Sequence, residues 1–295
     1  MTPHYHAYLA PARATNQIWR LVLGVMLITG IYVAWMVGMG AVMWLAAGLA
    51  GFERQLARIG GGSDPWSLIL LLSTFLGAWA GTAITLRVLH RRRLRSLFGR
   101  PPVVLRDFVL GVAMMAAIGG GLGLILAPFM PGLERATPPG VWLSFLPLAL
   151  LGILIQTGAE ELVFRGYIQG QLAARFRSPL VWLTVPTILF GLAHYAPEDS
   201  GANVWIVVAA TGLFGLVASD LTARTGSLGL AWGLHFANNV LAILVISVTG
   251  GLDGLALLHL PAAAASDAVL RPLLLSDMAL MALVWLGCRL WLRRR

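Results

Sequence analysis

Two adjacent glutamates, Glu160 and Glu161, stand inside a strongly apolar part of the sequence. They follow the apolar run 141–157, and Arg165 comes four residues after Glu161. An ionised carboxylate in a hydrocarbon environment is costly unless it is paired or faces water, so acids in such a segment are candidates for a functional site. Residues four apart share a helix face, so Arg165 can pair with Glu161. Glu160 points in another direction and has no local partner. A purely structural ion pair therefore accounts for Glu161 but not for Glu160.

Two further polar clusters occur in apolar segments downstream. Phe190 and His194 are four residues apart, and so are His235 and Asn239. Each pair therefore lies on one face of a predicted helix. A single histidine in an apolar helix is usually a hydrogen-bonded packing residue, but two histidines together with a double glutamate favour a catalytic site.

These residue types can hydrolyse a peptide bond without a covalent intermediate. A glutamate shielded from water binds a proton more tightly, so Glu160 can act as a general base on a water molecule that His194 orients. His235 and Asn239 can donate hydrogen bonds to the developing oxyanion. The alternative is zinc, because Glu160, His194 and His235 offer three ligands and leave a fourth position to water. The sequence has neither H-E-x-x-H nor G-x-S-x-G, so other protease classes fit poorly.

The composition is that of a polytopic membrane protein. Of the 295 residues 58% are hydrophobic and only 11% are charged, whereas soluble domains have about 25% charged residues. The net charge of +9 does not indicate a nucleic-acid partner, because the basic residues gather between apolar runs and at the C-terminus, as they do in cytoplasmic loops. The partner that this composition predicts is membrane lipid. The single cysteine, Cys288, excludes an internal disulfide and a cysteine-based metal site.

Eight apolar stretches predict an all-α fold, a polytopic membrane helical bundle with about eight transmembrane helices. The stretches are 18–49, 66–89, 107–130, the segment from 141 through the glutamates, 179–194, 203–221, 227–248 and 270–292. A turn near Gly38 and Gly40 would give nine, but no charge marks such a turn. Four glycines in the third stretch, between 119 and 123, predict close helix packing there.

We expect one membrane domain with three parts. Residues 1–140 hold a short polar tail (1–16) and the first three helices, 141–250 form the catalytic core, and 251–295 contain a loop, the last helix and a basic C-terminus. If the fourth and fifth helices form a hairpin that turns near Arg177, Glu160 and His194 lie equally far from the turn, at roughly 25 Å. We therefore expect them to face each other in a polar cleft. The basic segment 90–106 predicts that this cleft and both termini are cytoplasmic.

In order and spacing, the three clusters resemble the signature of the CAAX protease and bacteriocin-processing family (CPBP, or Abi) of intramembrane proteases, which includes the type II CAAX prenyl endopeptidase. The E-E-x-x-x-R motif is matched by Glu160, Glu161 and Arg165, F-x-x-x-H by Phe190 and His194, and H-x-x-x-N by His235 and Asn239. The resemblance covers roughly residues 140–247. The outer helices carry no recognisable signature.

The resemblance implies a peptidase, either a glutamate protease or a metalloprotease. It implies that Glu160 activates water with His194 and that His235 and Asn239 stabilise the oxyanion. Glu161 and Arg165 would then hold these residues in position. We expect a metal-independent mechanism, with zinc as the alternative. The expected substrate is a peptide or protein, lipidated at a CAAX-like C-terminus or otherwise hydrophobic there, and the expected location is a bacterial inner membrane.

Two hypotheses from other functional classes remain open. The chain can be a membrane scaffold or immunity factor that keeps this fold without catalysis. It can also be a proton-coupled transporter, because buried glutamate and histidine chains serve as proton relays. Few ionisable groups lie in the outer halves of the predicted helices, which disfavours the transporter.

Overall fold

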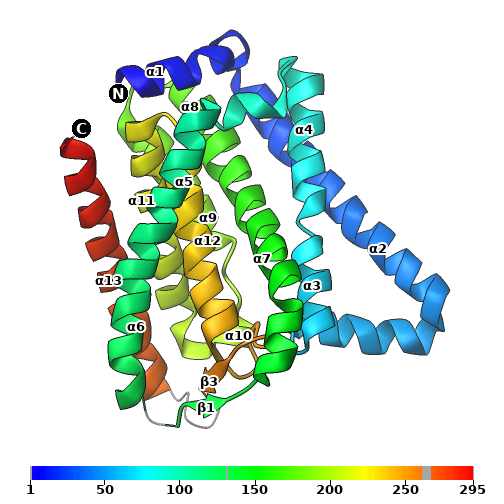
Figure 1. The fold of residues 1–295 in the computed structure, drawn as a ribbon. Coiled ribbons are helices and arrows are strands. Elements are labelled where there is room, and N and C mark those ends of the chain that lie inside the picture. Colours follow the sequence, from blue (N-terminus) through cyan, green and yellow to red (C-terminus); the bar gives the residue numbers. More distant parts are fainter. Residues whose placement is uncertain (1, 131, 261–266, 295) are drawn as a thin grey trace.

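The computed structural model describes residues 2–130, 132–260 and 267–294 and shows a bundle of long helices with a small sheet at one end (Figure 1). The predicted all-α membrane bundle is confirmed. Six described segments are long and apolar enough to cross a membrane, namely Ile18–Gly61, Pro65–His90, Pro101–Phe129, Pro139–Arg175, Gly201–Thr225 and Leu270–Arg293. The apolar helices Pro179–Leu192 and Gly229–Val245 are shorter. Each of the eight predicted stretches thus contains a helix, although the fifth helix ends at Leu192 and residues 246–248 of the seventh stretch form a strand. The number of eight membrane crossings is not confirmed.

The elements follow one another in simple order along the chain. The helices are α1 (Pro3–Leu9), η1 (Ala10–Thr15), α2 (Ile18–Gly61), α3 (Pro65–Ser73), α4 (Leu76–His90), η2 (Leu94–Leu97), α5 (Pro101–Met115), η3 (Ala116–Gly120), α6 (Gly121–Leu126), η4 (Ala127–Phe129), α7 (Pro139–Glu161), η5 (Leu162–Gln169), α8 (Gly170–Arg175), α9 (Pro179–Leu192), α10 (Pro197–Ser200), η6 (Gly201–Asn203), α11 (Val204–Thr225), α12 (Gly229–Val240), η7 (Leu241–Val245) and α13 (Asp267–Arg293). Three short strands, β1 (Glu134–Arg135), β2 (Ile246–Val248) and β3 (Leu258–Leu260), form a sheet in the order β1-β3-β2, with β1 antiparallel and β2 parallel to β3.

The N-terminal segment packs on the bundle. The Thr2 hydroxyl donates to the backbone carbonyl of Ala223 at 3.1 Å. Tyr5 is fully buried, and its ring lies 5.6 Å from that of Trp182 near the start of α9. The expectation of a polar tail over 1–16 is therefore wrong, because apolar side chains of α1 are removed from solvent. In Figure 1 α1 lies across the end of the bundle that also holds both termini.

Helix α2 is one continuous helix past Gly38 and Gly40, which excludes a tight turn there. Its break comes later, at Gly48, where φ is 68° and ψ is 177°. Glycine adopts this conformation without the steric cost that other residues incur. Figure 1 shows α2 leaving the bundle up to this elbow and then running back to α3. The predicted polar loop after residue 49 is therefore helical as far as Gly61.

The closest helix packing joins α5 to α12, the helix that carries His235. A Cβ atom at Gly233 would lie 2.1 Å from the carbonyl oxygen of Phe108, and one at Gly229 or Gly111 would also meet backbone at less than 3 Å. Real Cβ atoms do not approach backbone so closely, so these glycines fix the distance between the two helices. In the predicted glycine run, a Cβ at Gly119 would lie 3.6 Å from the side chains of Leu241 and Leu280, whereas one at Gly121 would meet nothing within 4 Å. The run therefore packs on other helices at Gly119, but the close approach to backbone occurs at Gly111 of α5.

Candidate active site

Two tryptophans hold α7 just before the double glutamate. The indole of Trp79 donates to the carbonyl of Ile155 at 2.8 Å, and that of Trp232 donates to the carbonyl of Leu154 at 3.3 Å. A Cβ at Gly158 would lie 2.7 Å from the Trp79 ring, so glycine lets both indoles reach the helix backbone. These contacts, from α4 and α12, fix the rotation of α7 and hence the directions of the glutamates.

Glu161 and Arg165 form a buried ion pair, as their spacing predicts. The guanidinium nitrogen lies 3.2 Å from the carboxylate, and each side chain is only 1% exposed. The guanidinium also sits 4.3 Å from the centre of the Phe190 ring and 5.5 Å from that of Phe214. A buried charge is tolerated when it is paired, and aromatic faces attract a cation. The pair lies where α7 passes into the π-helical segment η5, a type of distortion that is frequent at functional sites.

His235 bridges the two glutamates. Its Nδ1 lies 2.8 Å from Oε1 of Glu161, and its Nε2 lies 3.5 Å from Oε2 of Glu160. A carboxylate only accepts hydrogen bonds, so Nδ1 carries a proton and Nε2 faces the second carboxylate. His235 of α12 thus lies close to both glutamates of α7.

Gln156 extends this network and is a residue that the sequence reasoning missed. Its Nε2 donates to Oε1 of Glu160 at 2.7 Å, and its Oε1 accepts from Nδ2 of Asn239 at 2.9 Å. The available signal was a polar side chain four residues before Glu160, on the same face of an apolar helix. An asparagine amide has two donor protons, so Asn239 keeps a second N–H beside this bond.

His194 lies beside the network without touching it. Its Nδ1 is 2.9 Å from the backbone carbonyl of Phe190, and the two rings are 4.8 Å apart. The carbonyl only accepts, so Nδ1 carries the proton and Nε2 of the neutral ring is an acceptor. No hydrogen bond joins His194 to Glu160 in the described structure. Both histidines, Gln156 and Asn239 line one cavity of about 180 Å³, to which α11 and α13 supply most of the remaining wall.

This cavity, which we call the site pocket, belongs to the half of the bundle away from α1. Trp182, near the start of α9, contacts Tyr5 of α1, whereas His194 follows the other end of α9. At 1.5 Å per residue these ends are roughly 20 Å apart. The end covered by α1 also receives the basic segment between α4 and α5. The site pocket therefore lies away from the turn near Arg177, at a depth similar to the roughly 25 Å predicted for Glu160 and His194. The opening of the cleft towards the cytoplasm stays a prediction.

The residues of the network do not form a metal site in this structure. Glu160 and His235 are in contact, but the described part of the chain contains no group of three histidine, cysteine, aspartate or glutamate side chains arranged to hold a metal ion. The three ligands that the zinc alternative requires, Glu160, His194 and His235, are therefore not gathered around one point. We assign no chemical step to a metal.

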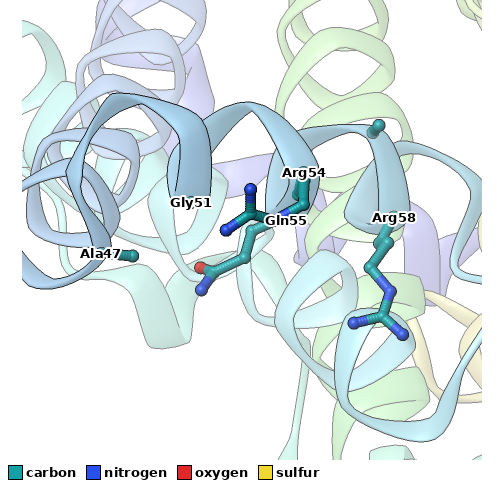
Figure 2. A pocket seen from close by; sticks show the side chains of 6 residues that line it. Ala47, Gly51, Arg54, Gln55 and Arg58 are labelled. Carbon is teal, nitrogen blue, oxygen red and sulfur yellow. The ribbon is translucent and has the colours of Figure 1, made fainter.

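A second hollow lies at the elbow of α2, far from the network (Figure 2). It is lined by Ala47, Gly51, Arg54, Gln55, Ala57 and Arg58. Figure 2 shows the arginines and the glutamine on the turns after the break. These six residues include no acid or histidine, so this hollow lacks a group for general-base hydrolysis.

The segment of the chain that contains the network is similar to known proteins. Residues 142–241, which contain every residue of the network, match the family model of the Rce1-like type II CAAX prenyl endopeptidases, and this confirms the resemblance found in the motifs. Protein YyaK of Bacillus subtilis (strain 168), described as uncharacterized, is 27% identical over 271 aligned positions that cover 85% of this chain and 86% of the relative. No solved structure matches the chain.

Proposed function

We propose that the protein is an intramembrane endopeptidase, because residues 142–241 match the family model of the Rce1-like type II CAAX prenyl endopeptidases. It would hydrolyse a peptide bond close to a hydrophobic C-terminus, such as a prenylated CAAX-like one. The observation that carries the proposal is the continuous chain of contacts from Arg165 through Glu161, His235, Glu160 and Gln156 to Asn239, next to the site pocket.

The first chemical step assigns a role to Glu160. A water molecule in the site pocket loses a proton to the Glu160 carboxylate, while Nε2 of His194 accepts its other hydrogen as a hydrogen bond and orients it. The resulting hydroxide attacks the carbonyl carbon of the peptide bond, and a new C–O bond forms. Gln156 supports the anionic form of Glu160 by donating to Oε1.

The second step returns the proton. Protonated Glu160 faces Nε2 of His235, which can accept this proton and pass it to the amine as the C–N bond breaks. Because both nitrogens of His235 are directed at glutamates, we propose proton transfer for His235 in place of the expected oxyanion role. The second N–H of Asn239 is the proposed oxyanion donor.

The ion pair of Glu161 and Arg165 orients the residue that we propose for proton transfer. The Glu161–Arg165 pair holds the Nδ1 side of His235 and so keeps Nε2 aimed at Glu160.

We further propose a bacterial inner-membrane location with both termini in the cytoplasm, following the basic segment 90–106. In that orientation α1 covers the cytoplasmic end of the bundle, and the site pocket lies in the other half. A peptide would then reach the pocket from within the bilayer or from the non-cytoplasmic side. The position of the pocket does not favour the expected opening of the site towards the cytoplasm.

The test uses purified protein in detergent and a fluorogenic peptide that ends in a farnesylated cysteine followed by apolar residues. Glu160→Gln keeps the shape of the side chain and removes the base, so we expect cleavage to fall by roughly 10²–10⁴-fold. The matched control is Glu53→Gln, which removes an exposed carboxylate from the far arm of α2 and should leave cleavage unchanged. Each protein is assayed with and without a zinc chelator.

Three outcomes separate the hypotheses. Cleavage that needs Glu160 and survives the chelator supports the glutamate mechanism. Cleavage that the chelator abolishes and zinc restores would assign zinc binding to the histidines and replace the mechanism above. Undiminished cleavage by Glu160→Gln would refute the role of Glu160, and a biological function fully restored by that variant would favour the scaffold.

A further inference from the structure

Helix α13 carries an acidic residue, Asp277, inside the last membrane-spanning segment. Met281, Val284 and Cys288 follow it at four, seven and eleven residues and are at most 3% exposed. These spacings place all four residues on one stripe of the helix, and the buried members show that this stripe faces the bundle. Leu283, on the opposite side, is 54% exposed. The carboxylate therefore points into the bundle and away from lipid.

Asp277 itself is exposed, unlike the three residues that follow it on this stripe. Its side chain lines the site pocket together with His194, His235 and Asn239. It makes no hydrogen bond or ion pair with any residue in the described parts of the chain. A carboxylate at membrane depth without a partner is costly, and such residues usually face a cavity that a substrate or ion occupies.

Contacts hold α13 in place both before and after Asp277 along the helix. On one side Asp220 of α11 accepts from Trp285 at 2.9 Å and from Arg289 at 3.1 Å. On the other side Arg271 donates to Asn203 at 3.1 Å. These contacts fix α13 against α11 at two levels, and the site pocket lies between the levels. Asp277 is thus held at a defined place in the wall of the pocket.

We propose that Asp277 is a specificity-determining residue that selects peptides with a lysine or arginine side chain near the bond to be cleaved. This inference rests on the proposed function, and it names a feature of the substrate. Glu160, Glu161 and Arg165 together carry one negative charge next to the site pocket, and Asp277 adds a second in its wall. The nearest arginine on α13, Arg271, already donates to Asn203. A cationic side chain of the substrate would supply the missing partner in an environment where ion pairs are stronger than in water.

The experiment uses pairs of farnesylated fluorogenic peptides that carry either lysine or norleucine at one position, scanned along the residues that flank the cleaved bond. Wild-type protein should prefer lysine at one of these positions. Asp277→Asn should lower kcat/KM for that lysine peptide roughly tenfold or more, mainly through KM, because it removes a charge-assisted hydrogen bond. It should leave the norleucine peptide unchanged. Asp277→Lys should reverse the preference towards a glutamate peptide, and Glu53→Gln is the control for loss of a remote carboxylate.

Binding is measured in parallel, by fluorescence anisotropy of the same peptides, so that a failure of the proposed hydrolysis is distinguishable. If wild type binds the lysine peptide more tightly and Asp277→Asn loses that difference, the inference holds even without cleavage. Equal effects of Asp277→Asn on the lysine and norleucine peptides, or no lysine preference in either assay, would overturn it. Thermal unfolding of each variant in the same detergent identifies losses that come from misfolding.

Discussion

Replacing Gln156 by leucine tests whether the hydrogen-bond network positions the catalytic base. The substitution keeps the approximate volume of a side chain that is 8% exposed and removes both of its hydrogen bonds. One of these bonds, at 2.7 Å, goes to the carboxylate of Glu160, and the other, at 2.9 Å, comes from Asn239. Without them the carboxylate can rotate away from the site pocket, and the Asn239 amide loses the bond that orients its second N–H.

The magnitude follows from these two bonds. A hydrogen bond to a charged group contributes about 1.5–3 kcal/mol, and one between neutral groups about 0.5–1.5 kcal/mol. If only the bond to Glu160 affects the transition state, kcat should fall roughly 10- to 150-fold. KM should change little, because Gln156 acts through Glu160 and the proposal gives it no contact with the peptide. Gln156 is therefore a positioning residue.

The assay is steady-state cleavage of the farnesylated peptide, with kcat and KM determined separately. Gln169→Leu is a matched control, because Gln169 is a fully buried glutamine of the same long helix that donates to the carbonyl of Ser219 at 2.9 Å, outside the network. It should lower stability without lowering kcat by a comparable factor. A kcat for Gln156→Leu within about twofold of wild type, or an equal fall for both variants, would refute the reasoning.

Two further predictions concern stability. Arg165→Met leaves Glu161 buried without its cation and should destabilise the protein by about 3–5 kcal/mol, which thermal unfolding should show as a lower midpoint. Adding Glu161→Gln to this variant should partly restore the midpoint. If the destabilising effects of the two substitutions are additive, the pairing is contradicted. Gly233→Ala places a Cβ against the backbone oxygen of Phe108 and should destabilise by about 1–3 kcal/mol; Gly121→Ala is its control, and equal midpoints for both variants would show that α5 and α12 can move apart.

The bundle and the ion pair at its centre follow from local features of the sequence. Long apolar stretches predict membrane helices because an unpaired backbone polar group is costly in lipid. The pairing of Arg165 with Glu161 needs only the spacing of one helical turn. The contact between Phe190 and His194 is also local, although α9 ends at Leu192 and His194 follows it. The three motifs, and their resemblance to a known family, could therefore be found from the sequence alone.

The remaining features depend on how the helices pack. His235 reaches both glutamates because α12 approaches α7, and no periodicity in either segment specifies this contact. Gln156 is one polar residue in an apolar run, and only the structure shows that it joins Glu160 to Asn239. The position of the site pocket depends on which end of the bundle α1 covers. The break of α2 at Gly48 was missed because glycines at 38 and 40, which remain helical, look the same in sequence.

The docking of α1 has a consequence for the order in which the molecule is assembled. Thr2 and Tyr5 leave the ribosome long before α11 does, because the carbonyl that Thr2 contacts belongs to a residue 221 positions later. The first segment must therefore wait beside the membrane until α11 has been inserted, and contacts between such distant segments form late. Helix α1 can therefore dock on the bundle only after α11 has been inserted. A bulky group attached near Thr2 should slow this last step, whereas the same group after α13 should not.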